Sequence, residues 1–183
     1  MKKHILYTLL SAGLLISGIA HSEFYAGAGF GASFNGGSSY NGPHAVKYKN
    51  SKIWSLVGGY EAPLPAFDIR GEAEYLHTRP EVKDGRTKQL DALFLNGYAD
   101  IPLIPVVDPY VGLGIGFGRF DHDNSFAMQG MLGVDYELPF APMTLSGEYR
   151  YLKMNETTGK GDRESKYHTN ILMFKARYLF DLL

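Results

Sequence analysis

Residues 111–118 read VGLGIGFG, an unbroken alternation of a large apolar side chain with glycine. Successive side chains of a β-strand point to opposite faces, so one face of this segment is apolar and the other carries only glycine. In a helix the same residues would be scattered around the axis, and each glycine would cost roughly 0.8–1 kcal/mol relative to alanine. The segment is therefore predicted to be a strand. A glycine face suits the inside of a small closed barrel, where bulky side chains of other strands need room, and the apolar face then points into lipid.

The same two-residue period recurs along most of the chain after residue 23 and predicts eight strands. Both faces of the fourth strand carry apolar residues; we place Leu93 and Leu95 outward, so that Asn96 and Asp100 point inward. The predicted strands are residues 24–34, 52–61, 67–77, 89–100, 109–120, 125–138, 143–153 and 165–180.

The connections between these strands alternate in kind. Polar loops follow the first, third, fifth and seventh strands, and three of them are long (35–50, 78–88 and 154–164), whereas short turns with proline follow the second, fourth and sixth. Short turns at one end and longer loops at the other are typical of bacterial outer-membrane barrels, which have an even number of strands. The prediction is an all-β, eight-stranded antiparallel up-and-down transmembrane β-barrel with short periplasmic turns and longer extracellular loops.

A soluble antiparallel barrel or sandwich with both faces reversed has the same periodicity. Three features favour the membrane barrel instead. Glycine faces would leave backbone unsupported in solvent, aromatic residues cluster near the strand ends as an interfacial girdle requires, and the connections alternate in length. Strands of about 11 residues tilted by about 40° also span roughly 27 Å, close to the apolar band of such barrels.

The N-terminus has the features of a secretory signal. Lys2 and Lys3 precede a mostly apolar run over residues 5–20, and small residues permit cleavage after Ala20 or after Ser22. An N-terminal membrane anchor is the alternative, but this run is short beside the roughly 20 residues that a membrane-spanning helix needs. We expect a signal peptide over residues 1–20 and a barrel domain over 21–183, in the outer membrane.

Composition excludes several classes of function. Without Lys2 and Lys3 the chain has 16 basic and 19 acidic residues, a formal charge of −3, which gives no support to nucleic-acid binding. Cysteine is absent, so there is no disulfide framework, thiol nucleophile or thiolate metal site. No cofactor, metal or catalytic residue is predicted.

Charged residues near the strand centres should point into the barrel, because Arg or Lys facing lipid at mid-depth costs roughly 2–4 kcal/mol. Buried charges must pair. We expect Arg70 to meet Glu61 or Asp135, and Arg150 to meet Glu74 or Glu148. Lys175 and Arg177 are expected to meet Asp135 and Glu137. The predicted lumen network comprises Glu61, Asp68, Arg70, Glu72, Glu74, Asp135, Glu137, Glu148, Arg150, Lys175 and Arg177. An ion path lined by these groups is the alternative, although eight strands enclose a space that side chains fill.

Four segments carry a family resemblance. Residues 96–102 (NGYADIP), 109–114 (PYVGLG), 133–136 (GVDY) and 147–151 (GEYRY) resemble the eight-stranded outer-membrane barrels of the opacity and neisserial surface protein A group and the rickettsial major surface antigens. The likeness spans nearly all of the chain after the signal. It implies the barrel fold, and it implies function only broadly, since these families include adhesins and immune-evasion proteins.

The loops are the predicted place of function. The extracellular basic candidates are Lys47, Lys49, Arg79, Lys83, Arg86 and Lys88. They suggest contact with lipopolysaccharide phosphates or sulfated host glycans. We expect a monomeric surface protein that mediates adhesion, with outer-membrane lipid, lipopolysaccharide and a host-cell or matrix ligand as partners.

Three other functions compete with adhesion: a structural envelope role, a narrow porin-like channel and an enzyme that modifies lipid A. Some barrels of this kind act on lipid A through serine, histidine and an acid, and His122, Asp123 and Ser125 lie close in sequence, with His77 and His168 also near the rim. The compact His-x-Ser element of the lipid A deacylases is missing, which disfavours the enzyme.

Overall fold

The computed structural model describes residues 23–39, 46–47, 49–64, 67–81, 89–101, 106–120, 123–156 and 165–180. The expected signal peptide lies outside these ranges. The elements are β1 (Glu23–Ser39), β2 (Val46–Lys47), β3 (Ser51–Pro63), β4 (Asp68–Thr78), β5 (Leu90–Asp100), β6 (Asp108–Phe120), β7 (Asp123–Glu137), β8 (Met143–Glu156) and β9 (Ser165–Phe180). A search of these ranges finds no helix with the length and apolar character needed to cross a membrane.

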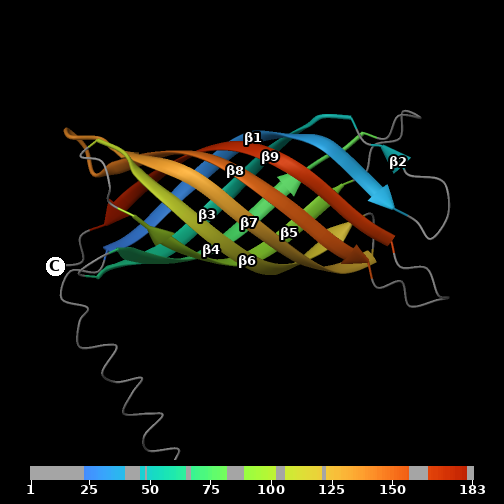
Figure 1. Ribbon diagram of the computed structural model, residues 1–183, viewed down its shortest axis with the longest axis horizontal. Coiled ribbons are helices and arrows are strands. Elements are labelled where there is room, and N and C mark those ends of the chain that lie inside the picture. Colours follow the sequence, from blue (N-terminus) through green and yellow to red (C-terminus); the bar gives the residue numbers. More distant parts are fainter. Residues whose placement is uncertain are drawn as a thin grey trace, which may run out of the picture.

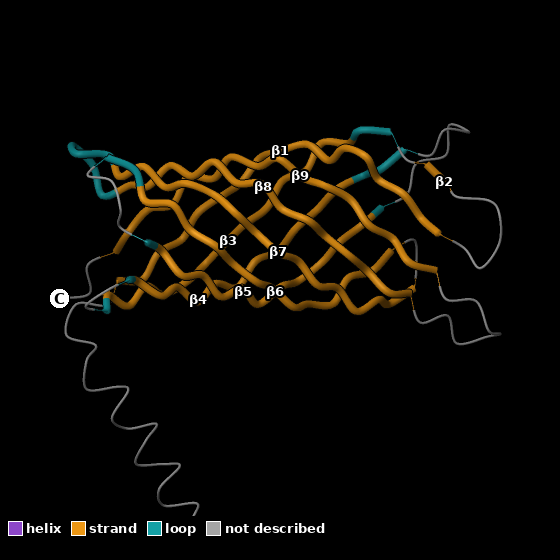
Figure 2. Tube along the Cα trace, viewed as in Figure 1, coloured by secondary structure: helices purple, strands orange, loops and turns teal. Residues whose placement is uncertain are grey.

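Eight of the strands form one closed antiparallel barrel (Figure 1). Each strand from β3 to β8 pairs with the next in sequence, and β1 pairs with β3. β1 also pairs with β9 along its length, which closes the sheet. The two-residue β2 adds only to the end of β1. The strands run obliquely around the long axis, as Figure 2 shows. The predicted fold class is confirmed.

The first strand is longer than the sequence predicted. The segment after Phe34 is polar and rich in glycine and serine, so it was expected to be loop, but β1 continues to Ser39. A register shift lies between Phe34 and Gly37, after which β1 pairs with β9 as far as Lys166. The long partner strand β9 satisfies the backbone hydrogen bonds of this polar extension. Side-chain periodicity carries no information about such backbone pairing, so the sequence did not predict the extension.

Side-chain burial follows the predicted alternation. The outward residues of β6 are apolar and exposed, with Leu113 at 76% and Phe117 at 71%. The uncertain fourth strand, β5, has its predicted orientation: Leu95 is 66% exposed, whereas Asn96 and Asp100 are buried. The barrel therefore presents an apolar outer surface.

The glycines of β6 make room inside the barrel for large side chains from β5. A Cβ on Gly112 would collide with the ring of Tyr98, and one on Gly116 would collide with the backbone and ring of Phe94. This explains why the inward face of the strand lacks side chains.

Aromatic rings pair near both ends of the barrel, as interfacial girdles do. At the end with the short turns the ring centroids of Phe24 and Tyr60 lie 5.1 Å apart, and those of Tyr178 and Phe180 lie 5.0 Å apart. At the other end Trp54 lies 5.5 Å from Tyr75.

Candidate functional site

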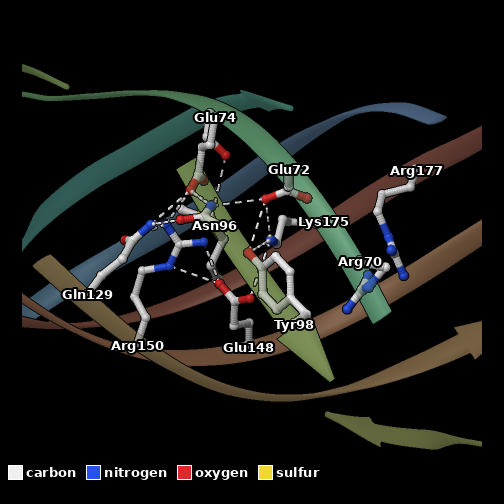
Figure 3. Close-up of polar contacts among 12 residues, drawn as sticks. Arg70, Glu72, Glu74, Asn96, Tyr98, Gln129, Glu148, Arg150, Lys175 and Arg177 are labelled. Carbon is white, nitrogen blue, oxygen red and sulfur yellow. Dashed lines mark hydrogen bonds and ion pairs between the residues drawn. The ribbon is translucent and has the colours of Figure 1, made fainter. Parts of the chain in front are cut away.

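Arg150 of β8 lies at the centre of a fully buried polar cluster in the lumen (Figure 3). Its Nη1 donates to Glu74 Oε2 at 2.9 Å and to Gln129 Oε1 at 3.1 Å. Its Nε donates to Glu148 Oε1 at 2.8 Å, and Nη2 contacts the same oxygen. One guanidinium thus joins β4, β7 and β8 across the inside of the barrel.

Lys175 of β9 connects this cluster to a neighbouring carboxylate. Its Nζ lies 3.3 Å from Glu148 Oε2 and 3.4 Å from Glu72 Oε1, and it also contacts the Tyr98 hydroxyl at 3.2 Å. Asn96 Nδ2 donates to Glu72 at 3.2 Å and to Glu74 at 3.0 Å. The three buried carboxylates therefore share two cations and several neutral donors, which compensates their desolvation.

A second cluster lies nearer the end with the short turns. Arg70 Nη2 donates to Asp100 Oδ1 at 2.8 Å, and Nη1 lies 3.1 Å from Asp135 Oδ2. Arg177 pairs with the same oxygen of Asp135 and approaches Glu61 at 3.9 Å. The Arg70 guanidinium also lies 4.7 Å from the ring centroid of Tyr98, within range for a cation–π contact.

Most of the predicted lumen residues lie in these two clusters, but some pairings differ from expectation. Lys175, expected beside Asp135 and Glu137, instead pairs with Glu72 and Glu148. Asp100, absent from the predicted network, is a partner of Arg70. Strand periodicity shows which residues face the lumen but not which of them meet across it, and this explains the contact of Lys175 with Glu72. Asp100 was expected to face the lumen, and it lies on β5 directly beside β4, diagonal to Arg70.

Asp68 and Glu137 lie at the mouth of the barrel rather than among the central ion pairs. Both line a small cavity of about 30 Å³, together with Glu61, Asp135 and Arg177. Asp68 also accepts a hydrogen bond from the backbone nitrogen of Leu64 at 3.3 Å.

The half of the lumen toward the longer loops contains a large apolar cluster, with buried serines and threonines beside it. The sequence prediction missed this layer, although the inward positions there alternate as strictly as the charged ones do. The buried cluster consists of Ile53, Leu76, Leu90, Ala92, Phe94, Ala127, Leu152, Met154, Tyr167, Ile171 and Met173. At both levels, side chains such as Arg150 and Leu76 are 0% exposed to a water-sized probe. The described lumen is thus occupied by side chains along its depth.

The predicted basic residues of the rim are distributed over several segments. Lys49 and Arg79 are exposed, and Lys49 Nζ forms an ion pair with Glu81 at 2.8 Å. Lys47 belongs to β2. Lys83, Arg86 and Lys88 lie outside the described residues.

Of the residues considered for lipid A chemistry, the three whose side chains the structure describes do not share one face. Ser125 is buried on the inside of the barrel, while His77 and His168 are half-buried on its outside. Asp123 begins β7, and His122 lies outside the described residues. In the part of the chain that the structure describes, no group of three or more His, Asp or Glu side chains is arranged to hold a metal ion.

Comparison with solved structures finds several outer-membrane barrels of similar fold. Neisserial surface protein A matches with a TM-score of 0.59 and 18% identity, covering 86% of this chain and 97% of that one. The outer-membrane enzyme PagL matches at 0.55 with 12% identity, covering 82% and 97%. Ail of Yersinia pestis, in complex with the heparin analogue sucrose octasulfate, matches at 0.50 with 17% identity, covering 86% and 99%.

Comparison with curated protein sequences gives no significant match. The model of the outer membrane protein beta-barrel domain matches residues 7–180, nearly the whole chain. With its closed eight-stranded barrel, apolar outer face and paired charges inside, the chain belongs to the outer-membrane β-barrel domain family.

Proposed function

We propose that this barrel is a surface protein that mediates adhesion through its extracellular loops. The observation that carries the proposal is the packed lumen, in which an ionic layer and an apolar layer lie in series. A lumen filled by side chains favours a scaffold over a channel, because the side chains stabilise the barrel wall and leave no path for ions or solutes. The longer connections at one end are then the parts free to vary and to bind.

The chemistry of the connections favours a polyanionic ligand such as a sulfated glycan. Residues 82–88 (VKDGRTK) carry three basic residues and one acidic residue. Exposed Arg79 adds to this charge at the start of the same connection. Clustered cations attract anionic polymers, with an affinity that falls as salt rises. The fold similarity to Ail, solved with a heparin analogue, is consistent with this ligand class.

We further propose that the chain reaches the membrane with a signal peptide cleaved after residue 20 or 22, and that it acts as a non-enzymatic monomer. Mass spectrometry of the purified protein would give the new N-terminus. A mature chain that retains Lys2 and Lys3 would contradict the cleavage.

The adhesion proposal is tested in a non-adherent Gram-negative host that expresses the protein. Residues 82–88 are replaced by a short Gly-Ser link in one variant, and residues 157–164 in the other. The second segment (TTGKGDRE) has two basic and two acidic residues, so it is a control of similar length without net charge. We expect attachment to heparin-coated surfaces to fall several-fold in the first variant and to stay unchanged in the second. Attachment of the parent protein should weaken at a salt concentration of roughly 0.5 M.

Heat-modifiable gel mobility confirms that each variant is folded. Equal attachment by the parent protein and the 82–88 variant would overturn the loop assignment. No attachment above that of the empty host would overturn adhesion itself.

A further inference from the structure

The outer wall of the barrel has a shallow hollow above its apolar band, on β3, β4 and β5, lined by aromatic and charged side chains. Its volume is about 750 Å³, and it is lined by Lys52, Trp54, Tyr75, His77, Arg79 and Asp91, among others. These side chains point away from the lumen, so the hollow is separate from the ionic clusters described above.

The strand register arranges the wall here in steps of decreasing polarity toward the membrane. Lys52 and Arg79 are exposed at the top. Trp54 pairs with His77, and His77 with Asp91, one step lower. The next step consists of Leu56, Tyr75, Leu93 and Phe117, which are direct neighbours across β3 to β6. A ligand that fills the hollow therefore meets cations at one end and lipid-facing apolar side chains at the other.

The middle step is held rigidly by its own contacts. The Trp54 ring lies 5.2 Å from His77 and 5.5 Å from Tyr75. Asp91 Oδ1 accepts the Tyr75 hydroxyl at 2.6 Å and lies 2.7 Å from His77 Nδ1, while Oδ2 accepts from Gln89 at 2.6 Å. Both oxygens of the only carboxylate in this step are thus engaged by neighbours, and the indole, 42% exposed, is fixed as a flat platform.

The charge at this level of the wall favours an anion. Lys52 and Arg79 line the top of the hollow, and exposed Arg119, just outside its lining, is the cross-strand neighbour of Asp91. Glu81, at the edge of the hollow, is paired with Lys49 at 2.8 Å. Arginine and lysine with an adjacent aromatic face are suited to phosphate on a sugar, because the cations bind the phosphate and the ring packs on the sugar.

We propose that this hollow binds the phosphorylated glucosamine headgroup of lipid A from the surrounding outer leaflet, with the acyl chains lying over Leu56 and Leu93. An amphiphile is required because the hollow opens sideways and continues into the apolar wall, whereas a soluble glycan would leave the lower step uncovered. The site shares Arg79 with the loop surface proposed above for adhesion, but Lys52, Trp54 and Tyr75 belong to the barrel wall. It makes the barrel a specific partner of the lipid around it.

Trp54 is the only tryptophan of the chain, so its fluorescence reports on the hollow alone. The full-length protein, refolded in zwitterionic micelles, is titrated with bis-phosphorylated lipid A while the emission is recorded. We expect a saturable change whose midpoint rises by about tenfold in the double variant Lys52→Gln/Arg79→Gln, the loss of roughly 1.4 kcal/mol. Both residues are exposed, and gel mobility verifies the fold.

The matched control is Lys153→Gln. Lys153 is an exposed outward lysine on β8, on the opposite side of the barrel ring from β4. Its variant should bind lipid A like the parent protein. An unchanged midpoint in the double variant would contradict binding at the hollow. An equal shift of the midpoint with Lys153→Gln would also contradict it, because the binding would then be a general attraction of lipid A to basic residues of the rim.

Two further ligands test the identity of the occupant. Lipid A without phosphates should bind several-fold more weakly, and a water-soluble phosphorylated glucosamine disaccharide without acyl chains should not saturate the signal in the same range. Saturation by the soluble disaccharide at the same midpoint would overturn the assignment to lipid.

Discussion

At the scale of single residues, Arg150 maintains the charge balance of the lumen. Its guanidinium contacts Glu74 and Glu148, and all three side chains are 0–1% exposed. Burying either carboxylate without its cation would cost several kcal/mol, far more than a surface ion pair contributes. The stability of the barrel should therefore respond to this one side chain.

We predict that Arg150→Met lowers the free energy of unfolding by about 3–5 kcal/mol, because buried Glu74 loses its cation and buried Glu148 keeps only Lys175. Urea titration in lipid vesicles, followed by gel mobility, measures the loss. Adding Glu74→Gln and Glu148→Gln to the same variant should recover most of it. An unfolding midpoint equal to that of the parent protein would show that the ion pairs contribute no net stability.

Sequence reasoning succeeded in part at this scale. It predicted that Arg70, Arg150 and Arg177 would be matched by lumen carboxylates, since charge at mid-depth cannot face lipid. It failed for Lys175, whose partner Glu72 lies on β4, across the lumen from β9, and whose other partner Glu148 lies on the neighbouring β8. Contacts across the lumen depend on tilt and stagger, which side-chain periodicity does not encode.

At the scale of elements, the adjacent strands β5 and β6 show how an inward and an outward glycine differ in their tolerance of a side chain. A side chain on Gly116 would meet the backbone of Leu93 and the ring of Phe94, whereas nothing lies within 4 Å of a Cβ on the outward Gly97 of β5. The inward Gly116 of β6 is therefore required by packing, whereas the outward Gly97 of β5 is not.

We predict that Gly116→Val destabilises the barrel by about 1–3 kcal/mol through overpacking. Gly97→Val, its matched control, should stay within about 0.5 kcal/mol of the parent protein, because it points into open lipid. The same urea titration compares them. Equal losses would mean that strand flexibility, rather than the lumen contacts, accounts for the glycines.

The limits of strand prediction are also clear at this scale. The outward and inward sets of β5 were assigned correctly from Asn96 and Asp100, which could not face lipid. The extension of β1 to Ser39 was missed, because its pairing with β9 is a backbone property of the partner strand. Predicted ends are therefore least certain where polar strands leave the membrane.

At the scale of the whole molecule, the lumen has an ionic layer and an apolar layer in series. The fold class followed from the alternating pattern and the alternating connections, but the layering did not. The sequence prediction found apolar residues on both faces of the strand that contains Phe94, but it assigned Met154 to a loop and did not combine such residues of different strands into one layer. The apolar layer becomes visible in the sequence when inward residues of all strands are grouped by their distance from the strand ends.

We predict that the purified barrel in a planar lipid bilayer shows no steady conductance, because ions would have to cross the apolar layer without water. Single-channel recording against a known porin as positive control tests this. A charge-selective conductance that Arg150→Ala abolishes would contradict the prediction and restore the channel alternative.

The pairing of the first strand, β1, with the last strand, β9, constrains how the barrel can fold. Phe24 and Phe180, from opposite ends of the described chain, are register partners, and the pairing continues along both strands. Loop closure over this separation has a large entropic cost, and folds dominated by distant contacts form slowly. The N-terminal strand cannot find its second neighbour until the last strand has been synthesised and exported. Until then its edge is open to wrong partners, so the chain depends on being held unfolded on its way to the membrane.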